Sequence, residues 1–299
     1  METKDYWIHK NKVIFKQNFN DKLDNYFDII SKCNELIFSN YNDYNITIET
    51  NNEYRNEYYK NYKSSHFNQE VIIPENLTHL TFGWNFNKPI IIPQNVTHLT
   101  FGNHFNQPVI IPQNVTHLTF GFYFNQPIII PQNVTHLTFG YSFNQPVIIP
   151  QNITYLNLGN EFNQPIIIPE NVTHLTFGYH FNQKINLPNI KYIKINCNNM
   201  NLIENLPNSV EEIEFGECFN LELQNLPNSI KKISFDYHSE YNKELNCLPE
   251  FVEYLELGYY YDKKISKFPL NLKTIKCSKK YKYINDFIDK KKYNLITYN

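Results

Sequence analysis

The sequence predicts a β-rich solenoid of about eleven stacked turns with parallel strands, each turn built from one repeat of 19–22 residues. Three observations support this prediction: phenylalanine recurs every 19 residues, proline and glycine occupy fixed places in the repeat, and every copy contains a short strand-like phrase. A single copy cannot bury its own apolar side. We therefore expect the copies to stack and to share one continuous core.

Phenylalanine marks the period, and proline extends it. The central unit, FNQPIIIPQNVTHLTFG followed by two variable residues, recurs almost unchanged through residues 86–180. All 16 prolines and all 8 glycines fall at fixed repeat positions, which argues against a separately folded domain inside the array. The phenylalanines are Phe67, Phe86, Phe105, Phe124, Phe143, Phe162 and Phe181, and the second prolines are Pro74, Pro93, Pro112, Pro131, Pro150, Pro169, Pro188, Pro207, Pro227, Pro249 and Pro269.

The diverged C-terminal copies indicate which positions face the core. Val96, Leu99 and Phe101 stay apolar in the diverged copies, whereas the positions of His98 and Thr100 become Glu212 and Glu214 in one copy and Lys232 and Ser234 in the next. The phrase V-x-x-L-x-F is therefore expected to be a short strand whose alternate residues point into the core and into water.

The rest of the turn can be interpreted in the same way. Gly102 follows the strand, where the bend needs a backbone without a Cβ atom. Phe105 is expected to enter the core. The side chain of Asn106 is expected to be buried and to form hydrogen bonds with main-chain groups of the bend, and the repetition of these bonds in each turn would form a ladder. On the other side of the turn, Ile92 stays apolar and Ile91 becomes Asn, Cys or Lys, so that Ile91 faces water. The bracketing prolines limit this side to a short or irregular ladder.

The two ends are expected to close the array. Residues 1–66 are predicted to be an N-terminal cap with degenerate repeats. One worn copy is formed by Leu36 to Ser39 followed by Tyr44-Asn45, and residues 51–66 are expected to form a loop. Residues 67–280 form the repeat array, and 281–299 a C-terminal cap with a short helix.

Composition excludes several classes of function. The net charge is -2, so the whole-chain charge points to neither nucleic acid nor a membrane surface. Five cysteines without C-x-x-C spacing predict no disulfide framework and no metal site. We expect no cofactor, no signal peptide and a monomer in the cytoplasm. The six N-[VIL]-T sequons from Asn76 to Asn171 are then structural by-products of the repeat.

The sequence shows no catalytic constellation. It has no G-x-S-x-G and no phosphate-binding glycine loop, and residues 86–180 contain only the charges Lys88, Glu161 and Glu170. Carboxylates gather only in the diverged copies, where alternating lysines favour a solvated cap over a site. The chain is predicted not to be an enzyme. Those carboxylates are Glu211, Glu212, Glu214, Glu253 and Glu256.

A histidine ladder is the first candidate binding surface. It comprises His79, His98, His117, His136 and His174, interrupted by Tyr155. The rings are expected to stack on an exposed strand face, and protonation near pH 6 to destabilise the stack. The alternatives are a duplicated surface residue, a partner-binding row and a metal site.

An outward isoleucine stripe is the second candidate. An apolar ribbon of this length reaches the size that marks interaction sites. The alternatives are an aliphatic ladder shielded by the prolines and an expanded array that has not diverged. The stripe comprises Ile72, Ile91, Ile110, Ile129, Ile148 and Ile167.

The residue pair after each glycine is the third candidate. These pairs vary while their surroundings barely change, and they are rich in aromatic residues, as binding surfaces are. Neutral drift is the alternative. The aromatic members singled out as partner-binding candidates are Trp84, Phe122, Tyr123, Tyr141 and Tyr179.

The repeats resemble a known family. The phrase P-x-x-V-x-x-L-x-F looks like the L-P-x-x-L-x-x-L-x-L phrase of leucine-rich repeats, and FNKP at 86–89 and FNQP at 105–108 resemble the FNIP repeat, with Lys or Gln in place of Ile. That leucine-rich-repeat-like family is known from amoebae and the large viruses that infect them. The resemblance implies a solenoid and a non-enzymatic protein-interaction module, with an unknown protein of the host cell as its partner.

Two other functions stay open. Relatives in the FNIP family often carry an F-box that docks a ubiquitin ligase, which would make this chain a substrate-recognition adaptor; residues 1–66 show no leucine-rich helical pattern of that kind. A carbohydrate-binding or enzymatic β-solenoid would need carboxylates or bases clustered on one face.

Overall fold

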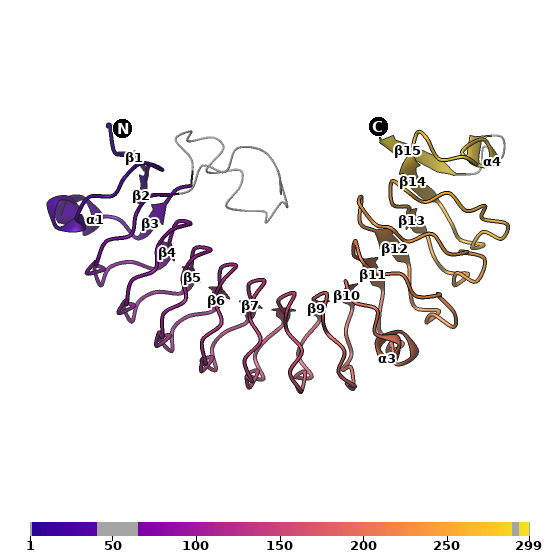
Figure 1. Ribbon diagram of the computed structural model, residues 1–299, viewed down its shortest axis with the longest axis horizontal. Coiled ribbons are helices and arrows are strands. Elements are labelled where there is room, and N and C mark those ends of the chain that lie inside the picture. The colour runs from indigo at the N-terminus through magenta and orange to yellow at the C-terminus, as the bar shows by residue number, and fades with distance from the viewer. Residues whose placement is uncertain (1, 41–64, 289–292, 299) are drawn as a thin grey trace. The chain divides into compact units, whose positions relative to one another are not determined.

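The computed structural model describes residues 2–40, 65–288 and 293–298 of the chain (Figure 1). The chain divides into two compact units, Met1–Asn152 and Ile153–Asn299, here called unit 1 and unit 2. Each unit is a stack of short strands joined by long irregular connections, as the sequence predicts.

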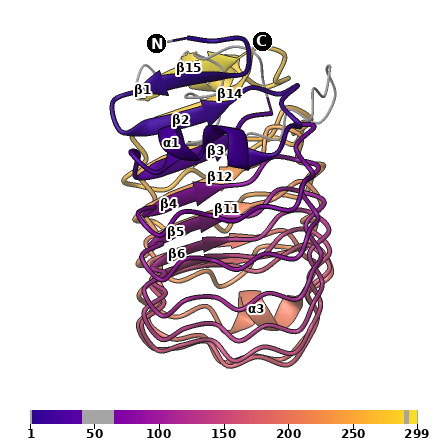
Figure 2. The same ribbon diagram turned by 90° about the vertical axis from the view of Figure 1, so that its left-hand side faces the viewer.

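Unit 1 contains seven strands among its described residues. β1 pairs with β2 in antiparallel fashion, and all subsequent pairs from β2 to β7 are parallel (Figure 2). A 3-10 helix and one short α-helix lie between β2 and β3. The elements are β1 (Tyr6–His9), β2 (Lys12–Phe15), η1 (Leu23–Tyr26), α1 (Phe27–Ile30), β3 (Glu35–Phe38), β4 (His79–Thr81), β5 (His98–Thr100), β6 (His117–Thr119) and β7 (His136–Thr138).

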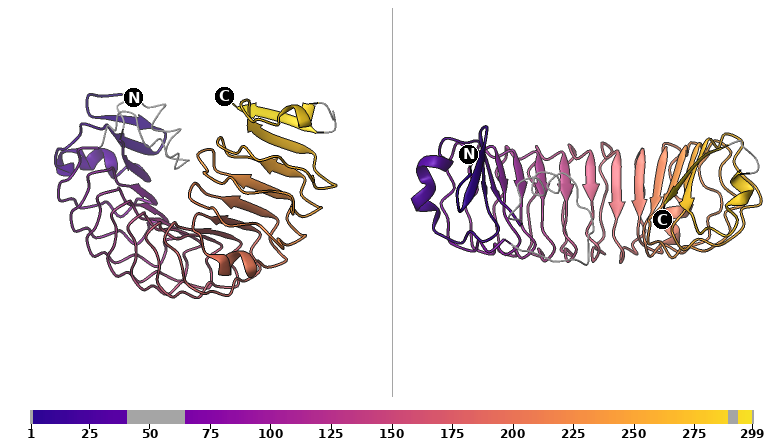
Figure 3. Two further views of the ribbon diagram at one scale, coloured as in Figure 1. Left: turned by 45° about the vertical axis from the view of Figure 1, so that its right-hand side comes forward. Right: turned by 90° about the horizontal axis from the view of Figure 1, so that it is seen from above.

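Unit 2 contains eight strands among its described residues, and every consecutive pair from β8 to β15 is parallel (Figure 3). Two short helices interrupt it. The elements are β8 (Tyr155–Asn157), β9 (His174–Phe177), β10 (Tyr192–Ile195), α3 (Met200–Glu204), β11 (Glu212–Phe215), β12 (Lys232–Phe235), β13 (Tyr254–Glu256), β14 (Thr274–Ser278), α4 (Asn285–Ile288) and β15 (Asn294–Tyr298).

The strand register confirms the period. Leu80 is paired with Leu99, and Leu99 with Leu118, so that each residue lies beside its own copy in the next turn. Each of the eleven second prolines precedes one strand, from β4 to β14. The segments that the prolines bracket form no strand, as predicted from their missing N–H donors.

The core consists of the positions that stay apolar in every copy. Val96, Leu99, Phe101 and Phe105 are at most 1% exposed, and their counterparts in the diverged copies are equally buried. Deletion of one such side chain removes its transfer free energy and leaves a cavity, which together cost about 3–5 kcal/mol for phenylalanine.

The turns of unit 1 spread apart away from the strand face. Histidine rings on that face are separated by 4.1–4.2 Å from centroid to centroid. Inside the core, the rings of Phe101 and Phe120 are 5.6 Å apart, and those of Phe86 and Phe105 are 6.1 Å apart. Residues on the back of the turn are therefore spaced more widely than residues on the strand face.

Glycine is required by close approach between turns and not by a left-handed backbone. None of the described glycines has positive φ. A Cβ atom on Gly102 would lie 1.8 Å from the carbonyl oxygen of Gly83, and one on Gly140 would lie equally close to the carbonyl oxygen of Gly121. The bend can stack on its own copy only if the side chain is a hydrogen atom.

The asparagine that follows each core phenylalanine forms the expected ladder. The main-chain N–H of Asn106 donates to Oδ1 of Asn87 at 3.0 Å, and Gln107 Nε2 donates to the same oxygen at 3.1 Å. The pattern repeats in the following turns. These asparagines are half-buried and not buried as predicted, because the amide ladder lies at the edge of the core.

The N-terminal residues join this ladder. Asn68 N–H and Gln69 Nε2 both donate to Asn20 Oδ1, and Phe19 stacks on Phe67 with centroids 5.7 Å apart. Phe19-Asn20 is therefore a hidden copy of the Phe-Asn pair, which the sequence interpretation missed.

The worn copy at Leu36 to Ser39 is confirmed by β3, in which Leu36 pairs with Leu80. Its core phenylalanine, however, is Phe67, which lies 4.1 Å from Phe38. Tyr44-Asn45 and most of the predicted loop 51–66 lie outside the described residues.

The C-terminal segment contains more than the predicted helix. α4 is present, and β15 then adds a further parallel strand, with Leu295 beside Ile275. The phrase N-L-I-T-Y is rich in residues that favour strands, and its alternation matches the preceding turns.

Candidate functional site

The histidine ladder in unit 1 is stacked as predicted. His79, His98, His117 and His136 lie in successive strands, with interplanar angles of 11–13°. Each ring also contacts the threonine that precedes it. Nδ1 of His98 lies 2.9 Å from Oγ1 of Thr97, and the other pairs are alike.

The threonines determine the tautomer of the histidines. Oγ1 of Thr97 donates to the carbonyl oxygen of Thr78, and Oγ1 of Thr116 donates to that of Thr97. A hydroxyl has one proton, so the threonine must accept from the histidine, and Nδ1 carries the hydrogen. The ladder is thus a row of identical imidazoles in which Nε2 is the acceptor when the ring is neutral.

Burial and the neighbouring histidines keep the rings of His98 and His117 neutral. Burial lowers the pKa of His98, and His79 and His136 lower it further, although Glu35 acts in the opposite direction. Burial and the neighbouring His98 and His136 lower the pKa of His117 to about 4. At neutral pH His98 and His117 are therefore uncharged. No group of three or more His, Cys, Asp or Glu within the described residues is placed to hold a metal ion.

In unit 2, the strand position that corresponds to the histidine ladder carries different residues. Tyr155, His174 and Tyr192 stack at 6.3 and 5.7 Å. Beyond them the strand face is charged, and charges pair across adjacent strands: Lys194 with Glu214 at 2.5 Å, and Lys276 with Glu256 at 2.7 Å.

The five carboxylates considered as an alternative enzymatic site are all held by neighbouring groups. Tyr192 Oη donates to Glu214 at 2.8 Å, and Tyr254 Oη donates to Glu256 at 3.1 Å. The remaining three each form an ion pair with a lysine of the next turn. These pairs are Glu211–Lys231, Glu212–Lys232 and Glu253–Lys273.

The isoleucine stripe is among the most exposed apolar features of the described residues. Ile72 is 77% exposed, and Ile91, Ile110, Ile129 and Ile148 in unit 1 are 88–89% exposed. Ile167 in unit 2 is 85% exposed. Neither the prolines nor their own copies shield these side chains, because the turns are widely spaced on this side. The alternative of a shielded aliphatic ladder is therefore wrong.

In unit 1, aromatic residues of the pairs after each glycine contact one another at one edge of the strands. Phe122 stacks on Tyr141 with centroids 4.6 Å apart, and Tyr123 meets His104 edge-on at 5.1 Å. Trp84 lies 6.2 Å from His104. In unit 2, Tyr179 packs edge-on against His180. Tyr123 and Tyr179 are exposed, and the other three candidate aromatics are half-buried.

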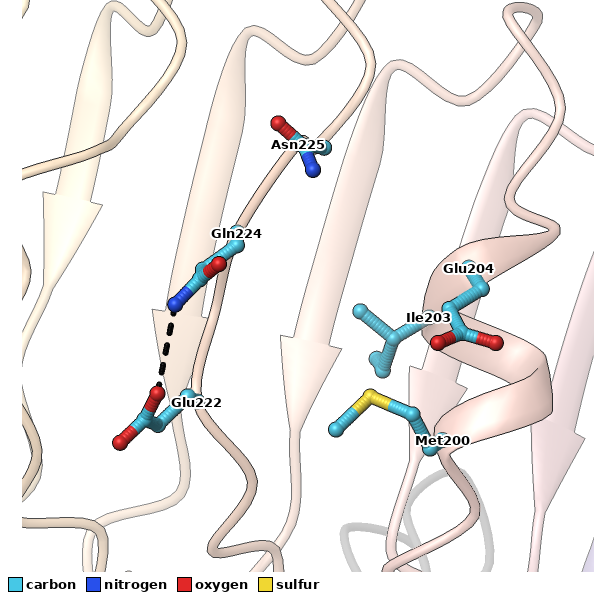
Figure 4. Close-up of a pocket in the computed structure, with 6 residues that line it drawn as sticks. All are labelled: Met200, Ile203, Glu204, Glu222, Gln224 and Asn225. Atoms are coloured by element: carbon cyan, nitrogen blue, oxygen red, sulfur yellow. Dashed lines mark hydrogen bonds between the residues drawn. The ribbon is translucent and has the colours of Figure 1, made fainter.

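A shallow cavity of about 360 Å³ lies beside α3, which the sequence interpretation missed (Figure 4). Met200, Ile203 and Glu204 come from α3, and Glu222 and Gln224 from the following turn, where Gln224 donates to Glu222 at 3.3 Å. The signal was present, because N-N-M-N-L-I-E replaces the usual phrase before Pro207. Its carboxylates are exposed, and nothing in the cavity forms a catalytic arrangement.

The fold and these surfaces define a leucine-rich-repeat-like solenoid, and the repeat itself identifies the family. The model of the FNIP Repeat family matches residues 67–104, 88–123, 105–142, 124–161, 143–168, 162–198, 198–238 and 241–282. The chain therefore belongs to the FNIP repeat family. No curated protein matches the sequence significantly.

A solved structure gives the same picture of the fold. The chain resembles CroV588, described as a novel circular leucine-rich repeat (LRR) protein, with a TM-score of 0.53 and 25% sequence identity. The match covers 93% of this chain and 58% of that chain, so this chain spans little more than half the length of CroV588. Among the described residues, no helix is long and apolar enough to cross a membrane.

Proposed function

We propose that the chain is a non-enzymatic protein-interaction scaffold and that the isoleucine stripe of unit 1 is its principal contact surface. The observation that supports this most directly is the near-complete exposure of four isoleucines in identical positions of successive turns. The repeat solenoid of the FNIP family is consistent with such a role.

The stripe has the properties of an apolar contact surface. An isoleucine contributes roughly 1.5–3 kcal/mol when it passes from water into a contact. Residues 89–160 contain no charged side chain, so a partner need not desolvate a charge there. The side chains are β-branched and stiff, which reduces the conformational entropy that binding removes.

Evolution of the repeat supplies the test variant. The diverged copies carry Asn186 and Asn205 at the stripe position, so Asn is compatible with the turn. We expect the variant Ile91→Asn/Ile110→Asn/Ile129→Asn/Ile148→Asn to fold normally but to capture much less of the partner protein than the unaltered chain does. Quantitative pull-downs from amoebal extract, with the variant and the unaltered chain as separate baits, measure this difference.

A matched control carries four substitutions on the strand face: Thr81→Ser, Thr100→Ser, Thr119→Ser and Thr138→Ser. It should retain the partner. If the asparagine variant captures the same proteins in the same amounts as the unaltered chain, the isoleucine stripe is not the contact surface.

We also propose that the protein acts in the cytoplasm. Cys33, Cys197 and Cys277 are buried free thiols, and burial raises the pKa of Cys197 and Cys277 to about 11. Such thiols are unreactive structural residues, suited to a reducing compartment.

The adaptor alternative gains no specific support. The described part of residues 1–66 forms β1 to β3, η1 and α1, of which α1 spans four residues. This segment extends the repeat stack, and its described residues form no helical docking domain.

A further inference from the structure

The last turns of unit 2 are strongly basic. Residues 263–282 contain eight lysines and neither Asp nor Glu, although the whole chain carries a net charge of -2. Charges farther apart than about 8–10 Å are largely screened at physiological ionic strength. A ligand at these turns is therefore exposed to the local lysines more than to the average charge of the chain.

Some lysines of this segment pair with carboxylates, as Lys267 does with Glu250 at 3.8 Å, and others contact tyrosines. On the strand face, Lys273 and Lys276 form ion pairs with Glu253 and Glu256, at 2.6 and 2.7 Å. After β14, the exposed Lys280 and Lys282 contact tyrosines. Lys280 Nζ donates to Tyr259 Oη at 2.8 Å and lies 5.5 Å from the centre of its ring.

The same arrangement continues along the segment. Lys282 lies 5.4 Å from the ring centre of Tyr283, and Lys264 lies 5.9 Å from it and 3.9 Å from Asp286. Tyr281 Oη donates to the carbonyl oxygen of Lys263 at 2.6 Å, which fixes that exposed lysine beside the same loop.

Exposed aromatic rings lie among these lysines. Tyr260 is 59% and Tyr237 is 42% exposed, and their rings lie 5.1 and 5.4 Å from that of Tyr259. All these groups follow the carboxyl ends of parallel strands β12 to β14, so they share one edge of the sheet. We call this set the basic–aromatic rim: Tyr237, Tyr259, Tyr260, Lys263, Lys264, Lys280, Lys282 and Tyr283.

We propose that the basic–aromatic rim binds single-stranded nucleic acid. Lysines that interact with the phosphates, together with tyrosine rings on which bases stack, are the combination that binds single strands without sequence preference. This role is independent of the proposed contact surface in unit 1, since it uses other residues in the other unit.

The rim is less suited to other anionic partners. A membrane-binding patch needs apolar side chains next to its lysines. The exposed Phe251 and Leu270 precede β13 and β14 and so lie at the opposite ends of those strands. An acidic protein would use the lysines but would not need exposed tyrosine rings.

Fluorescence anisotropy of the full chain with a fluorescein-labelled mixed-sequence RNA of about 20 nucleotides, and with the DNA of the same sequence, tests the proposal. With about four phosphate contacts, the affinity should fall more than tenfold between about 50 and 200 mM salt. Lys280→Gln/Lys282→Gln should weaken binding at least about fivefold and flatten the salt dependence. Tyr260→Ala should weaken binding at both salt concentrations.

The matched control is Lys231→Gln/Lys232→Gln, which removes the same charge from the strand face of unit 2. It should leave the affinity within about twofold. Thermal melting of each variant reports whether the fold is retained, and Tyr260 and the lysines are exposed, so no core is opened.

Three results would overturn the proposal. One is absence of binding of either oligonucleotide at low salt. Another is equal weakening by the control variant. The third is binding that Tyr260→Ala leaves unchanged and that heparin or vesicles of phosphatidylserine and phosphatidylcholine reproduce, which would indicate a general polyanion surface.

Discussion

Unit 1 and unit 2 have the same kinds of residue at their core positions but different residues at the positions that face water. In β4 to β7 of unit 1, the outward positions repeat His and Thr in every strand. In β10 to β14 of unit 2, the outward positions change from strand to strand and are mostly charged. The core positions hardly differ between the two, so they do not explain the contrast.

Parallel in-register stacking explains it. A residue repeated in every turn lies directly beside its own copy, so a repeated charge would face a like charge at about 5 Å. Identical turns must therefore be neutral on the outside. Unit 2 can carry charge only because its copies have diverged, and Lys231 then lies 2.8 Å from Glu211 and Lys232 3.0 Å from Glu212.

Histidine can carry a charge, yet it also satisfies the requirement that a repeated outward residue be uncharged. It is titratable, yet it repeats in unit 1, because burial and stacking lower the pKa of His98 and His117 and keep the rings uncharged at neutral pH.

The largest expected difference between the units concerns their glycines. A Cβ atom on Gly121 would lie 2.0 Å from a carbonyl oxygen, whereas one on Gly258 would be no closer than 3.0 Å to any atom. Gly121→Ala should therefore destabilise the protein by about 3 kcal/mol, and Gly258→Ala by about 1 kcal/mol. Denaturant unfolding of both variants measures this, and equal losses would contradict the close-approach argument.

The next effect comes from placing charge on the repeated column. His98→Glu/His117→Glu sets two carboxylates side by side and should destabilise the chain by about 2 kcal/mol, including the lost contacts with threonine. His98→Glu/His117→Lys imitates unit 2 and should recover about 1 kcal/mol of that loss. Chemical denaturation at low and high salt measures the free energy of unfolding of both variants. The difference between these free energies should be smaller at high salt.

Acid should weaken unit 1 through the histidine ladder. The folded pKa of His117 is about 4, below its unfolded value of 6.5, so the unfolded chain binds more protons between these values. The stabilising contribution is present above pH 6.5 and is lost as the pH falls towards 4. After discounting for partial exposure, we expect about 1 kcal/mol of loss at pH 5.

Melting temperatures between pH 7.5 and 5 measure this loss. His98→Gln/His117→Gln provides the control, because it removes the groups and should flatten the profile. A profile that is as steep in that variant would assign the pH dependence to other residues.

The smallest effect on stability belongs to the isoleucine stripe. Ile110→Asn/Ile129→Asn should change the free energy of unfolding by less than about 0.5 kcal/mol, because both side chains are 88% exposed in the folded chain. Equilibrium unfolding checks this. A large loss would show that the stripe supports the turn instead of facing a partner.

The sequence predicted the features that arise from repetition. Comparison of diverged and identical copies separated Leu99 and Phe101 from His98 and Thr100, and the observed burial agrees. The strand register, the histidine stack and the exposure of the isoleucines were predicted for the same reason: one turn determines all its copies. Whether any of these surfaces binds a partner stays a prediction.

What escaped prediction lies where repetition is broken. Phe19-Asn20 is separated from its neighbouring copy by 48 residues and not 19, so a search at a fixed period passes over it. The helix α3 lies where N-N-M-N-L-I-E departs from the repeat phrase, and the strand β15 follows the last copy that a proline marks. The basic–aromatic rim was hidden by the whole-chain charge, since the lysines of 263–282 are offset by acidic residues elsewhere. Only the fold shows which charges neutralise one another.

The separation of 48 residues has a practical consequence for protein engineering. Asn20 and Asn68 still form one step of the amide ladder, although the chain between them is far longer than one repeat. A foreign sequence inserted at the corresponding bend of another turn, such as after Asn103, should therefore leave the strand register between adjacent turns unchanged. The bend after the glycine offers one insertion site in each repeat, so foreign domains could be inserted at a regular spacing of one repeat.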